Sequence, residues 1–419
     1  MSVGDETTHH PGADWRSRFW CVFAGQASSL VGSALTQFVL LWWITDATGS
    51  VSALATAGLA ALLPQALIGP FGGVLADRYS RRLLMIAADA VSASCMLVLI
   101  ALFLSGRVEL WHAYIMIAVR STMQGIQQPA ATASIPMLVP ESFLSRAAGL
   151  DRTLASLTIV AAAPLGALAI GTMPLGLALG IDVATAVVGI MPLLVFRIPQ
   201  PVVPDGGQTD VLSELRDGAA LVCTHKGLRH LYMLLAALTL IVMPSSTLVI
   251  LLVKEQFLGG AVEVALMESA AGAGLIAGGI AATLRVPGRQ ILWVLWCSVL
   301  SSFTFALAAL MPTDLFWPAV AWWGLGHAAF VMGDAARLTL LLRVVPLHQQ
   351  GRALSLLTSV TALAGPVGIG LAIPIGEWIG VRWLFVLMGA VAGCVSLLAF
   401  SSAPLRQLGA DRDMRQASN

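Results

Sequence analysis

Charged side chains are scarce in this chain. Lysine and arginine together supply 23 of its 419 residues and aspartate and glutamate supply 22, so that 11% of the chain is charged while 58% is hydrophobic. A water-soluble domain of this composition would expose a large apolar surface to water. The formal net charge of +1 also argues against a nucleic-acid partner, which requires a basic surface. We therefore expect a polytopic membrane protein that binds no nucleic acid.

Cysteines and catalytic motifs are also few. The five cysteines stand singly along the chain, which predicts neither a disulfide framework nor a C-x-x-C metal site. The zinc-hydrolase motif H-E-x-x-H and the phosphate-binding motif G-x-x-x-x-G-K-[ST] do not occur. We expect no enzymatic activity, no bound metal, no cofactor and no ATP hydrolysis by this chain.

Long apolar runs dominate what is present. Each is long enough to cross a hydrocarbon core of about 30 Å at about 1.5 Å per residue. The runs predict twelve membrane-spanning helices, at residues 19–45, 51–76, 83–105, 110–134, 147–171, 174–197, 228–253, 261–284, 290–312, 315–337, 353–376 and 381–403. Because cytoplasmic loops retain positive charge, the arginines indicate that both termini are cytoplasmic. Only Arg107, Lys254 and Arg382 then fall outside.

The two halves of the chain repeat one another. Val139-Pro140 followed by Arg146 matches Val345-Pro346 followed by Arg352 at an offset of 206 residues, and Gly72-Gly73-Val74 matches Gly278-Gly279-Ile280 at the same offset. Parallel six-helix repeats imply a pseudo-two-fold axis along the membrane normal and a cavity near the midplane. The predicted fold class is all-α, with twelve transmembrane helices in two pseudo-symmetric six-helix bundles.

The longest polar stretch divides these bundles. We expect an N-terminal bundle at 1–197, a cytoplasmic linker at 198–227, a C-terminal bundle at 228–405 and a cytoplasmic tail at 406–419. The spacing of Leu212, Leu215, Ala219 and Val222 predicts a short amphipathic helix within the linker.

A charged segment joins the second and third predicted spans, and it reads Gly72-Gly73-Val74-Leu75-Ala76-Asp77-Arg78-Tyr79-Ser80-Arg81-Arg82. Such a cluster must lie at the water interface, and its paired glycines predict a close approach of the two helices that it joins. The segment resembles the loop signature G-x-L-a-D-r-x-G-R-R of the major facilitator superfamily, with Ser80 in place of the usual glycine. The chain resembles that superfamily over essentially its whole length.

This resemblance implies that the segment is a gating loop. Asp77 is expected to dock on the cytoplasmic start of the eleventh helix, where the helix dipole favours an anion, and to latch the outward-facing state. Arg352 stands just before that start and could contribute. Arg78, Arg81 and Arg82 complete the predicted loop, and their alternative role is topology alone.

Within the superfamily, the chain resembles the macrolide-efflux branch of bacterial drug:proton antiporters. The residues that carry this resemblance are Trp15-Arg16-Ser17-Arg18-Phe19, Ala24-Gly25-Gln26-Ala27, Ile86-Ala87-Ala88-Asp89, Arg120-Ser121 and Ile181-Asp182. The resemblance implies export of an amphipathic, drug-like molecule across the bacterial inner membrane in exchange for protons. Siderophore exporters share several of these features, so a siderophore or another natural product is an alternative cargo. A nutrient-uptake symporter and a membrane-embedded enzyme are less favoured alternatives.

Four ionisable residues inside the predicted spans are candidates for proton coupling. A charge at a helix centre costs about 3 kcal/mol on insertion scales, so each invites a functional explanation. The candidates are Glu268, Asp182, Arg120 and Asp89. For the acids the alternative is a neutral group or an ion pair that holds helices together, with Arg81 or Arg152 as a partner for Asp89. For Arg120 it is a structural hydrogen bond.

The cargo cavity is less visible in the sequence. Polar and adaptable side chains within the spans predict a lining by Gln26, Gln37, Gln127, Met243, His327 and Phe330. Small-Pro-x-Gly patterns in the fifth and eleventh helices predict kinks and close contacts at the interface between halves, at Pro164, Gly166, Pro366 and Gly368. As partners we expect a small amphipathic substrate, protons and lipid, with the protein a monomer.

Overall fold

The computed structural model describes residues 14–199, 220, 222–284, 288–346 and 349–408, and within this part of the chain the regular structure is helical. The first six helices are α1 (Trp15–Thr48), α2 (Val51–Arg78), α3 (Arg81–Leu104), α4 (Leu110–Leu138), α5 (Glu141–Thr172) and α6 (Leu175–Val195). The later helices are α8 (Lys226–Val242), α9 (Pro244–Gln256), α10 (Ala261–Leu284), α11 (Gln290–Leu310), α12 (Phe316–Val344), α13 (Gln350–Ile379), α14 (Val381–Ala399) and α15 (Ala403–Arg406). The predicted all-α membrane fold is confirmed.

Eleven spans in the described residues are long and apolar enough to cross a membrane. One of them is α8 and α9 together, which continue from Lys226 to Gln256 through a break at Met243 and Pro244. Proline has no backbone N–H to donate to the preceding turn, which explains the break. Helix α4 is not among the eleven, although it is 29 residues long. It carries Arg120 and three glutamines, which lower its mean hydropathy.

The chain divides into two compact units. Unit 1 comprises residues 1–39 and 64–207, and unit 2 comprises residues 40–63 and 208–419. The C-terminal end of α1 and the first part of α2 therefore pack with the helices of unit 2. The predicted amphipathic helix of the linker falls mostly outside the described residues.

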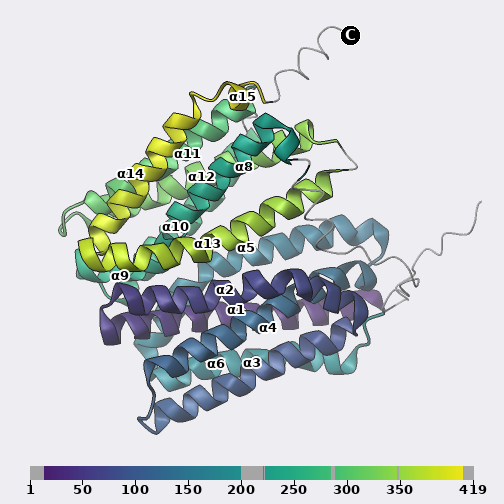
Figure 1. Cartoon of the computed structure of the whole chain (residues 1–419). Coiled ribbons are helices and arrows are strands. Elements are labelled where there is room, and N and C mark those ends of the chain that lie inside the picture. Colours follow the sequence, from purple (N-terminus) through teal and green to yellow (C-terminus); the bar gives the residue numbers. More distant parts are fainter. Residues whose placement is uncertain (1–13, 200–219, 221, 285–287, 347–348, 409–419) are drawn as a thin grey trace, which may run out of the picture. The chain divides into compact units, whose positions relative to one another are not determined.

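The two units use the same order of packing. In unit 1, α3 lies between α4 and α6, which are visible beside it in Figure 1. In unit 2, α11 lies between α12 and α14 in the same way, and α13 packs on α8. Equivalent helices thus occupy equivalent places, as the sequence repeat predicts.

Glycines at repeat-related positions make close helix contacts. A Cβ atom on Gly72 would collide with the carbonyl oxygen of Gly125 in α4, and one on Gly278 would collide with that of Ala328 in α12. Gly73 faces open space. The expectation that the paired glycines bring α2 close to α3 is therefore wrong, because the close contact is with α4. Small residues permit this approach because no side chain separates the backbones.

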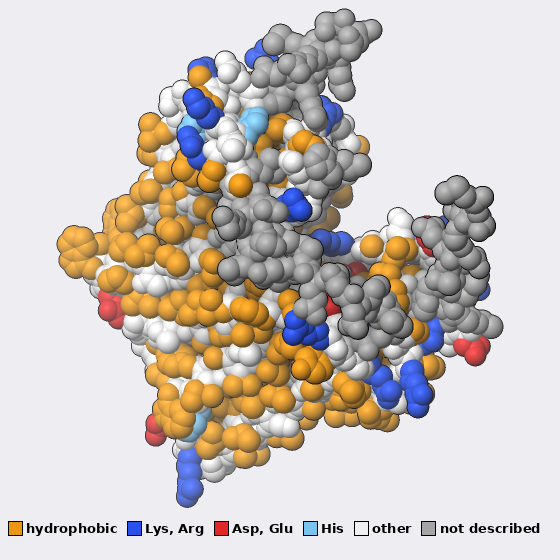
Figure 2. All heavy atoms as spheres, turned by 45° about the vertical axis from the view of Figure 1, so that its right-hand side comes forward, with side chains coloured by type: hydrophobic (Ala, Val, Ile, Leu, Met, Phe, Trp, Pro, Cys, Tyr) orange, Lys and Arg blue, Asp and Glu red, His pale blue; other side chains and the backbone are white. Residues whose placement is uncertain are grey.

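Large hydrophobic side chains cover much of the outer surface. Figure 2 shows hydrophobic side chains spread over much of one face, with the lysine and arginine side chains visible there in separate patches. Exposed examples are Val98, Leu168 and Trp378. An apolar surface of this extent fits contact with lipid chains rather than with water.

Candidate functional site

A polar stripe follows one face of α1 in unit 1. Gln26, Ser29, Ser33 and Gln37 are spaced by three, four and four residues, so they share one side of the helix. Most serines in these helices bond their own preceding turn, as Ser94 and Ser134 do. Ser29 and Ser33 instead donate to carboxylates on other helices. The stripe therefore builds a site between helices.

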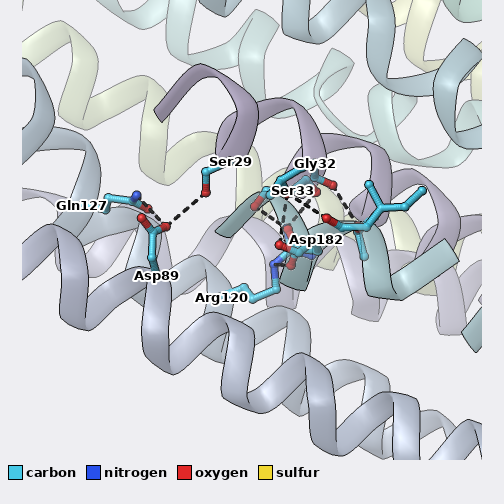
Figure 3. A network of polar contacts seen from close by, with 10 residues as sticks. Ser29, Gly32, Ser33, Asp89, Arg120, Gln127 and Asp182 are labelled. Carbon is cyan, nitrogen blue, oxygen red and sulfur yellow. Dashed lines mark hydrogen bonds and ion pairs between the residues drawn. The ribbon is translucent and has the colours of Figure 1, made fainter. Parts of the chain in front are cut away.

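The first part of this site is the Arg120 group, which consists of Ser33, Arg120 and Asp182. The hydroxyl of Ser33 donates to Oδ1 of Asp182 at 2.8 Å, and Nη2 of Arg120 donates to the backbone carbonyl of Ser33 at 2.8 Å. Nε of Arg120 lies 3.9 Å from Oδ2 of Asp182. The side chains of Arg120 and Asp182 are only 10% and 3% exposed. Arg120 on α4 and Asp182 on α6 thus form a buried ion pair, and both residues also contact Ser33 on α1 (Figure 3).

The second part is the Asp89 group, which consists of Gln26, Ser29, Asp89 and Gln127. Oδ1 of Asp89 accepts from Nε2 of Gln127 at 2.8 Å and from Oγ of Ser29 at 3.2 Å. Its Oδ2 accepts from Nε2 of Gln26 at 3.4 Å. All these donors are neutral. In the described residues no cation lies within ion-pair distance of Asp89, and Arg81 bonds elsewhere, to Asp77 and to two carbonyls.

The two groups share α1 and α4, and they lie one helical turn apart on α1, where Ser33 follows Ser29 by four residues, and two turns apart on α4. Gln127 follows Arg120 by seven residues on α4, and Gly189 follows Asp182 by seven on α6. The carbonyl of Gly189 accepts from Nε2 of Gln26 at 3.3 Å. A separation of seven residues places side chains on the same face, about 10 Å apart along the axis. Figure 3 shows the two groups in one view, joined through α1.

The charges of this site do not balance when every group is ionised. Asp89 and Asp182 are acidic and Arg120 is the only base among them, which leaves one negative charge in excess. Asp182 has the arginine beside it, whereas Asp89 has only amide and hydroxyl donors. A buried charge without a counter-ion is unfavourable, and a proton on Asp89 makes the site neutral. Of the two acids, Asp89 is the one without a counter-ion in the described residues, and a proton-coupling role for either stays a prediction.

Glu268 stands alone in unit 2. It is the eighth residue of α10, about 10 Å along the axis from the start of the helix. Within the described part of the chain it makes no hydrogen bond and no ion pair, unlike Asp89 and Asp182. An unpaired carboxylate inside a span favours its neutral, protonated form. The geometry therefore permits loading and release of a proton at Glu268 without disrupting any contact.

The loop between α2 and α3 is shorter than the sequence suggests. Helix α2 continues to Arg78 and α3 begins at Arg81, which leaves only Tyr79 and Ser80 between them. Ser80 caps α3, since its hydroxyl accepts from the N–H of Leu83 at 3.4 Å. Serine is a favoured N-cap residue, so it serves this turn without glycine's conformational freedom.

The arginines of this loop bind helix ends in unit 1. Arg82 donates to the carbonyls of Leu193 and Leu194 at the end of α6. Arg81 is buried and donates to the carbonyl of Ala133 in α4 and to that of Ala76. These bonds satisfy carbonyls that a helix end or a proline-containing helix leaves open. Both side chains thus tie α3 to its neighbours, in addition to any role in gating.

Asp77 lies at the surface, with its side chain 65% exposed and 3.5 Å from Nη2 of Arg81. Arg352 is also exposed, on the first turn of α13. Docking of Asp77 on the start of α13 stays a prediction, as does a gating role for Arg78.

The predicted cavity residues have diverse surroundings. Gln26 and Gln127 belong to the Asp89 group, and Nε2 of Gln37 is buried without a partner in the described residues. Nδ1 of His327 bonds the carbonyl of Trp323 at 2.9 Å, and its ring lies 5.2 Å from that of Phe305. The structure thus places His327 in an aromatic cluster within unit 2.

The remaining two cavity candidates lie on different helices. Phe330 is 57% exposed, whereas Met243 stands at the break between α8 and α9. A Cβ atom on Gly365 in α13 would come within 3.1 Å of Cγ of Met243. A cavity-lining role for either residue stays a prediction.

The glycines of the two small-Pro-x-Gly patterns make tight contacts inside their own units. A Cβ atom on Gly166 would collide with the ring of Phe38 in α1, and one on Gly368 would collide with the carbonyl oxygen of Leu240 in α8. Pro164 and Pro366 lie inside α5 and α13, which continue through them. The two patterns thus have the same packing role in each half.

Sequence reasoning missed Ser29 and Ser33, which complete both polar groups. It also missed the pair of Asp46 and Lys254 in unit 2, whose Oδ1 and Nζ atoms lie 2.8 Å apart. Nζ of Lys254 also donates to the carbonyls of Thr45 and Asp46 at the end of α1. The spacing of Ser29 and Ser33 with Gln26 along one helix face is the one signal that could have found the serines.

Comparison with known proteins identifies the family. The sequence profile of the Major Facilitator Superfamily matches residues 22–333. The chain belongs to this superfamily. As a superfamily member it is a multi-pass membrane transporter, and the family predicted from the loop between α2 and α3 is confirmed.

Individual relatives extend this result over the whole chain. This superfamily member is 28% identical to macrolide efflux protein A of Streptococcus pyogenes over 399 residues, which are 94% of this chain and 98% of the relative. A protein of the same name from Enterococcus faecalis is 27% identical over 74% of this chain and 97% of its own length. The predicted resemblance to the macrolide-efflux branch is therefore confirmed.

A solved structure supports the fold. The structure of a bacterial homolog to the human lysosomal transporter Spinster, in an inward-facing and unoccupied conformation, aligns with a TM-score of 0.68 and covers 94% of this chain and 98% of its own. At 14% sequence identity, this likeness concerns the fold alone.

Proposed function

We propose that this transporter exports amphipathic, drug-like molecules of the macrolide type from the bacterial cytoplasm in exchange for protons. The observation that carries the cargo class is the similarity to macrolide efflux protein A, which extends over 98% of the length of that protein. The proposal includes a location in the bacterial cytoplasmic membrane, with both termini in the cytoplasm.

Glu268 is the proposed proton-exchanging group. Its carboxyl has no partner in the described residues, and an ionised carboxylate at that depth costs about 3 kcal/mol. It therefore takes a proton from the outer side and releases it when the site opens to the cytoplasm. The carboxylate of Asp182 lies beside Arg120, with 3.9 Å between Oδ2 and Nε. Asp89 is a second proton site, because its excess charge has no counter-ion.

Whole cells test this proposal. An efflux-deficient bacterium expressing the protein should tolerate more macrolide than cells with an empty vector and retain less radiolabelled macrolide. A protonophore should abolish that difference in retention. Glu268→Gln and Asp182→Asn should lose at least about tenfold in export rate, which corresponds to 1.4 kcal/mol.

Glu377→Gln is the matched control, because Glu377 is an exposed carboxyl near the end of α13. Equal loss in this variant would assign the effect to expression rather than to coupling. Macrolide export that persists with a protonophore present would contradict proton antiport. No protection against any macrolide, combined with lost siderophore export under iron starvation, would favour the siderophore alternative.

A further inference from the structure

Two buried nitrogen atoms beside the middle turns of α1 lack a hydrogen-bond partner in the described part of the chain. They are Nη1 of Arg120 and Nε2 of Gln37. Native proteins pair nearly all such buried donors, so an unpaired one requires an explanation. The Arg120 side chain is only 10% exposed, and its other nitrogens already contact Asp182 and the carbonyl of Ser33. Nη1 therefore has no hydrogen-bond acceptor among the described residues, although the other two nitrogens of the guanidinium group have partners.

Both donors lie beside one turn of α1, Nη1 of Arg120 coming from α4 and Nε2 of Gln37 from α1 itself. Nη2 of Arg120 lies 2.8 Å from the carbonyl oxygen of Ser33. In an α-helix this oxygen also accepts from the N–H four residues later, which is that of Gln37. The guanidinium consequently lies beside the turn that Gln37 completes. The Gln37 side chain starts from the same face of α1 as Ser33, so both unpaired donors are on that side of the turn.

The nearby charges determine which kind of hydrogen-bond acceptor these two donors can bind. Asp182 already balances the charge of Arg120, and its side chain is 3% exposed. A second anion at this place would have no positive charge of its own and would meet the carboxylate of Asp182. An uncharged oxygen acceptor carries no such penalty and satisfies both donors.

We propose that Nη1 of Arg120 and Nε2 of Gln37 donate to an uncharged carbonyl oxygen of the cargo, such as the lactone carbonyl of a macrolide. This inference rests on the proposed function and names the group that unit 1 recognises. Gln37 is then a specificity-determining residue. Ser33 and Asp182 are positioning residues, because they orient Arg120 without touching the cargo.

Gln37→Leu tests the inference, since it removes the donor at similar size and leaves the Arg120 group intact. The matched control is Gln124→Leu on α4, because Gln124 is an exposed glutamine four residues from Arg120. Purified full-length variants in lipid nanodiscs are titrated with a radiolabelled macrolide. Infrared spectra with a ¹³C-labelled lactone carbonyl report its hydrogen bonding directly. The melting temperature of each variant without macrolide checks folding.

We expect Gln37→Leu to melt at or above the wild-type temperature, because it removes an unsatisfied buried donor, and to bind the macrolide about tenfold more weakly. The labelled carbonyl stretch should fall in frequency on binding to the wild type and to Gln124→Leu, and less on binding to Gln37→Leu. Unchanged affinity and an unchanged carbonyl shift in Gln37→Leu would overturn the inference and leave the proposed function standing. A wild-type protein that binds no macrolide would overturn both.

Discussion

At the residue scale, the two buried aspartates of unit 1 differ in their counter-ions. Asp182 has Arg120 at 3.9 Å, whereas Asp89 has only Ser29, Gln26 and Gln127. The same substitution should therefore act in opposite directions at the two positions. This contrast separates a structural ion pair from a site that can exchange a proton.

We predict that Asp182→Asn destabilises the protein by about 3 kcal/mol, because it leaves the buried charge of Arg120 without a counter-ion. Asp89→Asn should leave stability unchanged or raise it, since it removes an uncompensated negative charge and keeps one of the two acceptor oxygens, the one that Gln127 and Ser29 can still bond. Melting of purified protein in detergent measures both at neutral pH. Equal destabilisation by the two substitutions would refute the assignment of Arg120 to Asp182 alone.

The charged members of these groups can be predicted from the sequence, whereas the serines cannot. Asp89, Arg120 and Asp182 are visible in the sequence because a charge in an apolar run is costly. Ser29 and Ser33 are not, because a serine in a helix ordinarily bonds its own preceding turn. Only the packing of α3 and α6 against α1 turns their hydroxyls toward carboxylates. Which side chains meet is a property of tertiary structure.

At the scale of the elements, close glycine contacts determine which helices can pack. A Cβ atom on Gly368 would overlap the backbone carbonyl of Leu240, whereas one on Gly370 would meet nothing within 4 Å. Both glycines lie in α13, two residues apart, so they form a matched pair.

We predict that Gly368→Val destabilises the protein by about 3 kcal/mol, because α8 must move away from α13. Gly370→Val should be tolerated. Fluorescence-detected size-exclusion chromatography after heating measures both variants from the same expression host. Similar thermal profiles for the two would show that α8 and α13 do not pack as closely as described.

The end of α1 in unit 2 offers a second element-scale prediction. Lys254 binds two carbonyls at that helix end and the carboxylate of Asp46, which is 63% exposed. Exposed ion pairs contribute about 0–1 kcal/mol to folding stability. Backbone carbonyls without an intrahelical partner at the C-terminal end of a helix favour a cation beside them.

Asp46→Asn should therefore have little effect, and Lys254→Met should lower the melting temperature more. A double-mutant cycle on these two residues should give a small coupling energy, below about 1 kcal/mol. A large coupling would mean that the carboxylate, rather than the helix end, is the main partner of Lys254.

At the scale of the whole molecule, hydropathy predicts the membrane-spanning helices but does not predict where each helix begins and ends. The predicted span 261–284 coincides with α10. The predicted span 147–171 falls short of α5, which begins at Glu141. Hydropathy detects the part of a helix that lies in lipid, and a polar turn such as Glu141 to Arg146 extends the helix into water. The division into bundles at 198–227 stays a prediction.

Reconstituted transport tests proton coupling through Glu268 most directly. Proteoliposomes containing the wild-type protein or Glu268→Gln are given external radiolabelled macrolide, first for exchange against unlabelled macrolide inside and then for accumulation under an imposed pH gradient. A pH-sensitive dye reports proton movement in the opposite direction. We predict that Glu268→Gln retains exchange but loses both pH-driven accumulation and proton movement. Accumulation and proton movement equal to those of the wild type would contradict the assignment of the coupled proton to Glu268.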